Sequence, residues 1–314
     1  MLGTLVSGMV VSCGDNDNFE YDGPIPGGEV SGESTDNSWS ADDAAHGYEV
    51  PALRQGEGIY FVSHYARLNN SGSEKGLNYC LEWDASAYHS RWVAFVFDNT
   101  NNAKRVSRPD LQPWAEDPSL PESARLGIYG YSGSGYTRGH ICASADRLNS
   151  TEANNQTFYM SNMTPQLYNF NGGYWAVLEA LVQNWGRGTK FKRVYVCKGG
   201  TIRDDQLRGT FNTTNSAGKS CKVKVPKYNF MAILAETAGG SFQAIGFWME
   251  HKDYVDSKGN YYSSKNRAPT YLMKQHAMSI DDLENKTGIN FFCNLNDALE
   301  SAVERAYSES AWTW

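Results

Sequence analysis

The sequence lacks the features that define several protein classes. No apolar run reaches the roughly 18 residues that a membrane-spanning helix needs. No Cys-x-x-Cys or His-rich spacing is present, which argues against a structural zinc site. Basic residues are almost absent from the N-terminal part: residues 1–13 carry no charge, and residues 14–56 hold ten acids and one base, a net −9.

This charge distribution determines which classes of binding partner remain possible. The chain has a formal net charge of −7, which by itself argues against a polyanionic partner. Because residues 14–56 account for −9 and residues 1–13 for none, residues 57–314 carry +2. The acidity therefore belongs to the N-terminal segment, and a nucleic-acid partner is not excluded. With 13% aromatic residues, the chain is also unlike a disordered protein.

The N-terminus resembles the signal of a bacterial lipoprotein. Val10-Val11-Ser12-Cys13 has an aliphatic residue, a small residue and then a cysteine, as in a lipobox. We expect a lipoprotein signal peptide over 1–13, lipidation at Cys13, an acidic flexible tether over 14–56 and one large domain over 57–314. No Lys or Arg precedes Cys13, so the natural start is expected upstream of Met1. The expected location is the outer membrane or cell surface, with periplasm-facing and secreted forms as alternatives.

The other five cysteines predict limited cross-linking. In an oxidising compartment one or two disulfides are expected, with one thiol left over, and the pairing is open. Two of the five lie on the flanks of an expected hairpin. These two are Cys197 and Cys221, and the full set of five is Cys80, Cys142, Cys197, Cys221 and Cys293.

Short aromatic and β-branched stretches outnumber helical patterns. Apolar residues at helical spacing indicate a helix over 171–185, and Ser279 and Asn296 are expected to cap two further helices. Strands and helices do not alternate regularly, so the pattern predicts an α+β fold with a central antiparallel sheet flanked by helices. The expected strands cover 59–65, 79–83, 91–98, 157–161, 193–197, 222–235 and 241–251.

Three ordered blocks carry the candidate chemistry. They are Tyr136-Thr137-Arg138-Gly139-His140-Ile141-Cys142-Ala143-Ser144-Ala145-Asp146-Arg147, Ser161-Asn162-Met163-Thr164-Pro165-Gln166, and Phe170-Asn171-Gly172-Gly173-Tyr174-Trp175-Ala176-Val177-Leu178-Glu179. A histidine at a strand end, an asparagine at a helix start and a carboxylate two turns later suit metal-assisted attack on a phosphodiester. The imidazole can take a proton from water, and Mg²⁺ prefers oxygen ligands while keeping several waters.

In these blocks the sequence resembles the DNA/RNA non-specific endonucleases of the ββα-metal type, whose signature is Asp-Arg-Gly-His. The resemblance implies a ββα-metal (His-Me finger) nuclease fold and Mg²⁺-dependent cleavage of DNA and RNA, with Mn²⁺ as a substitute ion. It implies little sequence preference and products with a 5′-phosphate and a 3′-hydroxyl.

The same resemblance assigns roles to individual residues. His140 would be the general base, Asn171 the one direct protein ligand of the metal, and Glu179 the holder of a metal-bound water. Asn162 would stand behind these groups, and Arg138 would orient the site or the phosphate. The arginine that stabilises the transition state would be Arg108 or Arg105, and the resemblance does not choose between them.

Two positions depart from the family pattern. Thr137 stands where the signature has Asp, and Gln183 stands where the family often has Arg, four residues after the helix glutamate. These departures motivate an alternative, a weakly active or inactive nucleic-acid-binding surface lipoprotein on the same scaffold. A further alternative is a phosphodiesterase for another substrate.

Residues 187–227 suggest where a polyanion would bind. This stretch holds eleven bases and two acids, a local +9, as a groove that tracks a phosphate backbone requires. An equally open interpretation is a solvated β-hairpin with lysines on its outer face. No protein partner is predicted, and removal of residues 14–56 is expected to leave cleavage intact.

Overall fold

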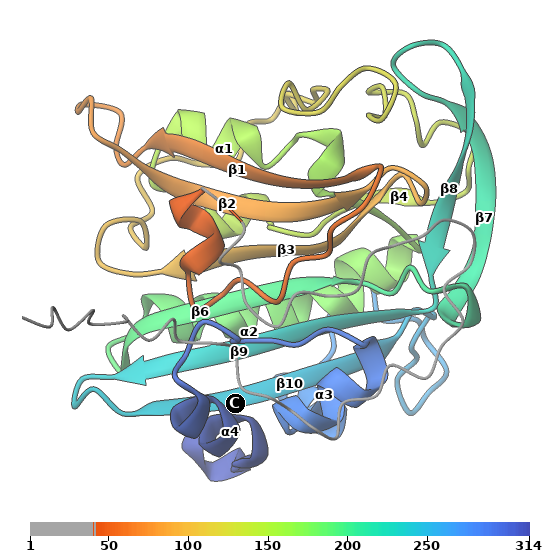
Figure 1. Cartoon of the computed structure of the whole chain (residues 1–314). Helices are drawn as coiled ribbons and strands as arrows, with labels where there is room; N and C mark the ends of the chain where they lie inside the picture. Colours follow the sequence, from red (N-terminus) through yellow and green to blue (C-terminus); the bar gives the residue numbers. More distant parts are fainter. Residues whose placement is uncertain (1–39, 41) are drawn as a thin grey trace, which may run out of the picture.

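A computed structural model describes residue 40 and residues 42–314 of the chain (Figure 1). Within that part, seven strands form one sheet in the order β1-β2-β3-β6-β9-β10-β11, and every neighbouring pair is antiparallel. The strands of this sheet are β1 (Ile59–Arg67), β2 (Lys75–Asp84), β3 (His89–Phe97), β6 (Phe191–Gly200), β9 (Tyr228–Thr237), β10 (Phe242–Glu250) and β11 (Ala277–Met278).

Two short ribbons and several helices complete the described part. The antiparallel ribbons are β4 (Thr137–His140) with β5 (Met163–Gln166), and β7 (Leu207–Thr214) with β8 (Ser220–Pro226). The α-helices are α1 (Thr151–Gln156), α2 (Ala176–Arg187), α3 (Ile280–Thr287) and α4 (Asp297–Arg305). The predicted α+β class with a central antiparallel sheet is confirmed. None of the helices in the described ranges is both long and apolar enough to cross a bilayer.

The main sheet separates two hydrophobic cores. Along β3, Val93 and Phe95 belong to the core that contains the apolar face of α2, whereas Trp92 and Ala94 belong to the core under α3 and α4. This alternation follows from the period of two in a strand, which sends successive side chains to opposite faces. Figure 1 shows α3 and α4 beside β10, and their contacts with that strand fix them there. The sheet is therefore covered on both faces.

The predicted boundary between tether and domain is wrong. Residues 14–39 and Cys13 lie outside the described residues, but from residue 42 onward the expected tether belongs to the domain. Ala45, Val50 and Leu53 are wholly buried in the core under α3 and α4. Arg54 Nε lies 2.7 Å from Glu82 Oε1 in β2. A few apolar residues spaced among polar ones are enough to dock this segment.

Two expected strands also differ from the structure. Residues 157–161 do not form a strand: they lead from α1 into a 3₁₀ turn over Met160–Asn162. The run 222–235 is divided between β8 and β9, which belong to different sheets. The break falls at Pro226, because proline has no N–H to donate and commonly ends a strand at a sheet edge. The other expected strands and the two capped helices are present.

The expectation of disulfides is also corrected. All five cysteines from Cys80 to Cys293 are free thiols. Cys197 belongs to the core under α3 and α4, whereas Cys221 packs against the core of α2, so the main sheet lies between them. The hairpin on which they were placed does not exist as one unit, since β6 and β8 belong to different sheets.

Candidate active site

A short ribbon presents the signature histidine. Strand β4 pairs with β5 so that His140 faces Met163 and Gly139 faces Thr164. A Cβ on Gly139 would lie 2.1 Å from Gln166 Oε1, so any other residue here would force the Gln166 side chain to move. After β5 the chain turns directly into the helical segment that carries Asn171 and Glu179. Two strands and a helix thus form one local unit around the candidate chemistry.

His140 is enclosed by aromatic rings. Its side chain is 8% exposed, and its ring centroid lies 4.9 Å from that of Phe158 and 5.5 Å from that of Trp114. Burial, followed by the charges of Arg108 and Lys198, lowers the pKa of His140 to about 3. Its Nε2 atom is buried and has no hydrogen-bond partner in the described part of the chain. The imidazole is therefore neutral at physiological pH and has an unused nitrogen.

Asn171 lies in a wide turn at the start of the helix. A π-helical turn over Phe170–Trp175 precedes α2, where the sequence predicted a regular helix from residue 171. Gly173 permits this turn to pack closely, since a Cβ there would lie 2.2 Å from the backbone nitrogen of Ser263. The turn places the half-buried Asn171 side chain against β4.

Thr137 fixes the orientation of the Asn171 amide. Asn171 Nδ2 donates to Thr137 Oγ1 over 3.1 Å, and Thr137 Oγ1 donates to the carbonyl oxygen of Gln166 over 2.9 Å. With its nitrogen engaged, Asn171 keeps Oδ1 as its acceptor, and within the described ranges that oxygen has no hydrogen-bond donor. A neutral oxygen held in this way fits a hard divalent cation. Thr137, which stands where the signature has Asp, is thus hydrogen-bonded to Asn171 within the site.

Glu179 belongs to a buried charge network. Lys198 Nζ lies 3.0 Å from Glu179 Oε1 and 3.2 Å from Asp146 Oδ2, and the Lys198 side chain is 2% exposed. Gln183 Nε2 donates to the other oxygen of Asp146 over 2.8 Å. One lysine from β6 therefore joins the helix carboxylate to Asp146, near the end of the first block.

The network governs the ionisation of its members. Burial raises the pKa of Glu179, and the Lys198 ammonium opposes that rise. Burial alone would lower the pKa of Lys198, but the carboxylates of Asp146 and Glu179 raise it above its ordinary value. Lys198 is therefore charged, and it favours the ionised form of Glu179.

Asn162 serves the backbone of the loop after His140. Its Oδ1 accepts from the backbone nitrogen of Cys142 over 2.7 Å, and its Nδ2 donates to the carbonyl oxygens of Cys142 and Thr157 over 2.8 and 2.7 Å. The side chain is wholly buried. Asn162 thus sets the path of the chain behind His140.

Arg138 is engaged by the protein itself. Its Nη2 donates to the carbonyl oxygen of Ile128 over 2.6 Å, and its guanidinium lies 4.9 Å from the ring centroid of Trp114. Because Trp114 packs against His140, this geometry favours orientation of the site over direct contact with a phosphate.

The structure separates the two candidate arginines. The guanidinium of Arg108 lies 5.2 Å from the ring centroid of Phe158, which packs against His140, and its charge acts on both His140 and Glu179. Both arginines are exposed, but the contact of Arg105 is through its backbone nitrogen, which donates to the carbonyl oxygen of Leu148. Arg108 is therefore the one placed beside the candidate base.

Sequence reasoning missed Trp114, Phe158 and the pairing of Lys198. Phe158 lay in an expected strand, and Lys198 was one of eleven bases in the stretch 187–227. A strongly apolar strand with a lysine near its end, Val-Tyr-Val-Cys-Lys, was the available signal for a buried charge.

In the folded protein, acids from outside the stretch 187–227 neutralise part of its positive charge. Lys198 Nζ pairs with Glu179 and Asp146, and Lys192 Nζ lies 2.6 Å from Glu236 Oε1; all three acids lie outside the stretch. Part of the local charge is thus offset within the domain, and a continuous groove does not follow from the charge count alone.

A ribbon followed by a helix, with a histidine on the ribbon and an asparagine at the helix start, defines a ββα nuclease unit. Residues 64–298 match the family described as "DNA/RNA non-specific endonuclease", and the chain belongs to that family. The match covers all the candidate site residues except the lipidation site.

Known nucleases resemble the chain over most of the domain. It is 28% identical to "Nuclease EXOG, mitochondrial" of Danio rerio over 78% of this chain and 68% of that protein. It is 30% identical to "Nuclease C1" of Cunninghamella echinulata var. echinulata over 70% of this chain and 82% of that protein. A solved structure of an EndoG/EndoGI complex shares the fold at a TM-score of 0.55 and 24% identity, over 76% of this chain and 89% of that one.

Proposed function

We propose that the protein is a Mg²⁺-dependent endonuclease that hydrolyses phosphodiester bonds of DNA and RNA with little sequence preference. The observation that carries this proposal is the neutral His140, whose Nε2 has no partner in the described part of the chain. It lies on the same ββα unit as the oriented amide of Asn171 and the paired carboxylate of Glu179.

The residues present fit a divalent ion of the Mg²⁺ type, with Mn²⁺ as the substitute. Asn171 would hold the ion through Oδ1, and Glu179 would orient a water beside it. Such an ion, when bound, supplies positive charge to the phosphate and the leaving oxygen. Proton transfer is the task of the protein: His140 Nε2 accepts a proton from the attacking water. Attack that expels the 3′-oxygen leaves a 5′-phosphate and a 3′-hydroxyl.

Arg108 is the proposed contact to the phosphate. An arginine beside the base can offer paired N–H groups to two phosphate oxygens. Arg105 is retained as a peripheral contact, and Arg138 and Asn162 as residues that position the site.

Cleavage of a supercoiled plasmid and of a structured RNA tests the proposal. Parent protein should degrade both with Mg²⁺ and neither with EDTA. His140→Ala should slow cleavage by about 10²–10⁴-fold, the usual contribution of a general base. The exposed His46 provides the control, and His46→Ala should cut as the parent does. Equal rates for parent and His140→Ala would overturn the assignment.

Binding without turnover is the outcome that would favour the inactive alternative. Its motivation was Thr137 and Gln183, yet both residues form hydrogen bonds within the site. Intact plasmid at every Mg²⁺ and Mn²⁺ concentration, with salt-sensitive retention of DNA, would establish it. Cleavage of a small diester but of neither polymer would instead indicate another phosphodiesterase.

We also propose export and lipid anchoring through Cys13. The support is the lipobox-like Val10-Val11-Ser12-Cys13 and the acidic stretch after it. Expression in a Gram-negative host with labelled palmitate should give a labelled, membrane-associated protein. Cys13→Ser should lose the label, and a labelled Cys13→Ser would refute the anchor site.

A further inference from the structure

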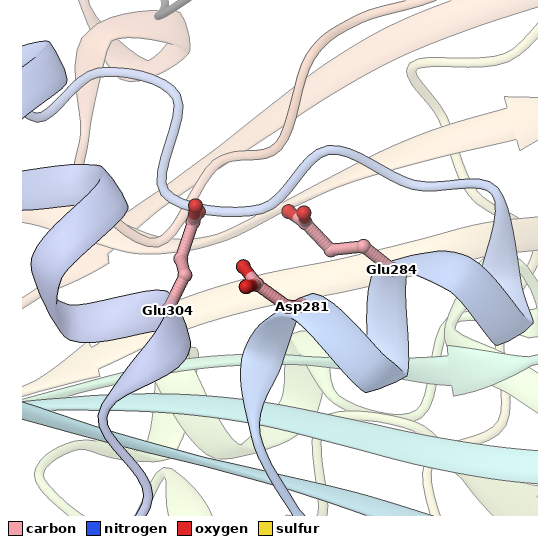
Figure 2. Close-up of side chains that lie close together, drawn as sticks. All are labelled: Asp281, Glu284 and Glu304. Atoms are coloured by element: carbon pink, nitrogen blue, oxygen red, sulfur yellow. The ribbon is translucent and has the colours of Figure 1, made fainter. Parts of the chain in front are cut away.

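Three acidic side chains meet between the last two α-helices. Asp281 and Glu284 come from α3, and Glu304 comes from α4; one carboxylate oxygen of each lies within 4.8 Å of the others. Figure 2 shows the three carboxylates gathered between α3 and α4. The sheet separates this cluster from the candidate active site, because α3 and α4 cover the face opposite α2.

These acids are buried to an unusual degree. Glu284 and Glu304 are each 2% exposed. Glu284 Oε1 accepts from the backbone nitrogen of Phe291 over 2.6 Å. Glu304 Oε1 is buried and has no hydrogen-bond partner in the described part of the chain. A buried carboxylate oxygen without a donor costs free energy unless another group satisfies it.

No lysine or arginine forms an ion pair with these three acids within the described ranges. Arg305 follows Glu304 directly but donates to the carbonyl oxygen and hydroxyl of Ser301. Burial, followed by the neighbouring Glu300 and Asp281, raises the pKa of Glu304 to about 9. Burial, followed by the charge of Glu304, raises the pKa of Glu284 well above its ordinary value. The cluster therefore requires protons or a cation at neutral pH.

We propose that Asp281, Glu284 and Glu304 bind a Ca²⁺-type divalent cation at a site separate from the catalytic centre. Ca²⁺ binds oxygens at about 2.3–2.6 Å, so ligands on opposite sides of the ion are about 4.6–5.2 Å apart. Oxygens within 4.8 Å of one another fit that shell with little movement of the side chains. Mg²⁺ dehydrates reluctantly and keeps several waters, which a buried cluster accommodates less well.

The expected role of this ion is to hold the C-terminal segment on the domain. It would join α4 to α3, while Glu284 also holds the backbone at Phe291. A little further on, Asn294 Nδ2 donates to the carbonyl oxygen of Ala45 over 2.9 Å. The ion would thus stabilise the region where the N-terminal and C-terminal segments meet.

Calorimetric titration with Ca²⁺ tests the site on the full chain. The Glu284→Gln/Glu304→Gln variant should bind one Ca²⁺ fewer than the parent. The exposed Glu57 gives a matched control, and Glu57→Gln should bind as the parent does. In Asn171→Ala, which lacks the proposed catalytic ligand, the cluster should still take up its ion. The test concerns stoichiometry and not cleavage, so it is independent of the proposed nuclease function.

Thermal unfolding provides the second measurement. At tenfold excess over Kd, Ca²⁺ should raise the Tm of the parent by about 3–6 °C, and Mg²⁺ should raise it less. The rise should be absent in Glu304→Gln, which removes one charge and is the milder variant if the double variant does not fold. A parent whose Tm and titration do not respond to Ca²⁺, or a cluster variant that binds as many ions as the parent, would overturn the proposal and indicate protonated carboxyls.

Discussion

Lys198 Nζ lies 3.0 Å from Glu179 Oε1, and the two side chains are 2% and 13% exposed. The pair joins β6 to α2, and Asp146 extends it into a network. In this chain Lys198 forms the ion pair with Glu179, while position 183, where the family often has Arg, holds a neutral amide bonded to Asp146.

Lys198→Met should impair both stability and activity. Removal of one partner from a buried ion pair typically costs about 3–5 kcal/mol in the free energy of unfolding, because the remaining charges stay buried. Without the ammonium the pKa of Glu179 rises further, so its ionised form appears only at higher pH. The acidic limb of kcat/KM should therefore move to higher pH, with a loss of about 10–100-fold at neutral pH, as for other groups that orient metal ligands.

An arginine at position 183 should replace the positive charge that Lys198→Met removes. In Lys198→Met, the second change Gln183→Arg places a cation beside Asp146 and one helical turn from Glu179. It should restore much of the activity and move the acidic limb back. The exposed Lys222 gives the control, Lys222→Met, which should behave as the parent does. An unmoved acidic limb in Lys198→Met would show that Lys198 does not act on Glu179.

Thr137 should determine how well the site binds its metal. Thr137→Val keeps the shape of the side chain but removes the hydroxyl that accepts from Asn171 Nδ2. The Mg²⁺ concentration for half-maximal cleavage should rise by about 10–100-fold, since the amide is no longer oriented. Thr137→Ser retains the hydroxyl and should stay near the parent. The same Mg²⁺ requirement in all three proteins would argue against this role.

The family resemblance and the local patterns predicted much of the site. The signature block placed His140 at a strand end, and the third block placed Asn171 at the helix start, because both depend on neighbours close in sequence. Lys198 could not be assigned to Glu179 in this way. Their contact depends on the packing of α2 against β6, and no short-range pattern reveals that packing.

The features that the sequence did not resolve have the same physical origin. The segment 42–56 looked like a tether because its composition is polar, yet a few apolar side chains with distant partners dock it. The charge of 187–227 was compatible with a groove or with a solvated hairpin, because the sequence does not show which bases meet distant acids after folding. Long-range pairing decides both cases.

Asn162→Ala should affect folding more than chemistry. The substitution leaves the backbone groups of Cys142 and Thr157 without three buried hydrogen bonds. At about 1 kcal/mol or more for each, the free energy of unfolding should fall by about 3 kcal/mol or more in urea titrations. Activity per folded molecule should fall far less than in Asn171→Ala, which should lose cleavage with little loss of stability. The reverse ranking would show that Asn162 takes part in the reaction.

The buried His140 should make stability depend on pH. Its pKa is about 3 in the folded protein and near 6.5 when exposed, so the unfolded chain binds the additional proton between these values. The parent therefore loses stability as pH falls below 6.5, and His140→Ala lacks this contribution. From pH 7.5 to 5.5 the variant should gain on the order of 1 kcal/mol relative to the parent in urea titrations. His46→Ala, at an exposed site, should show no such gain.

Two truncations should separate the domain from the segment before it. A chain that begins at residue 40 keeps every buried contact described for the N-terminal part, so it should cleave as the parent does. A chain that begins at residue 57 loses the wholly buried Val50 and Leu53, each worth about 1.5–3 kcal/mol. It also loses Arg54, the partner of Glu82 at 2.7 Å and of Asp84 at 3.1 Å. The unfolding midpoint of the chain that begins at residue 57 should fall steeply. It should lose cleavage at temperatures where the chain that begins at residue 40 is still active. Equal midpoints for the two chains would show that residues 42–56 contribute nothing to the fold, contrary to their burial in the core.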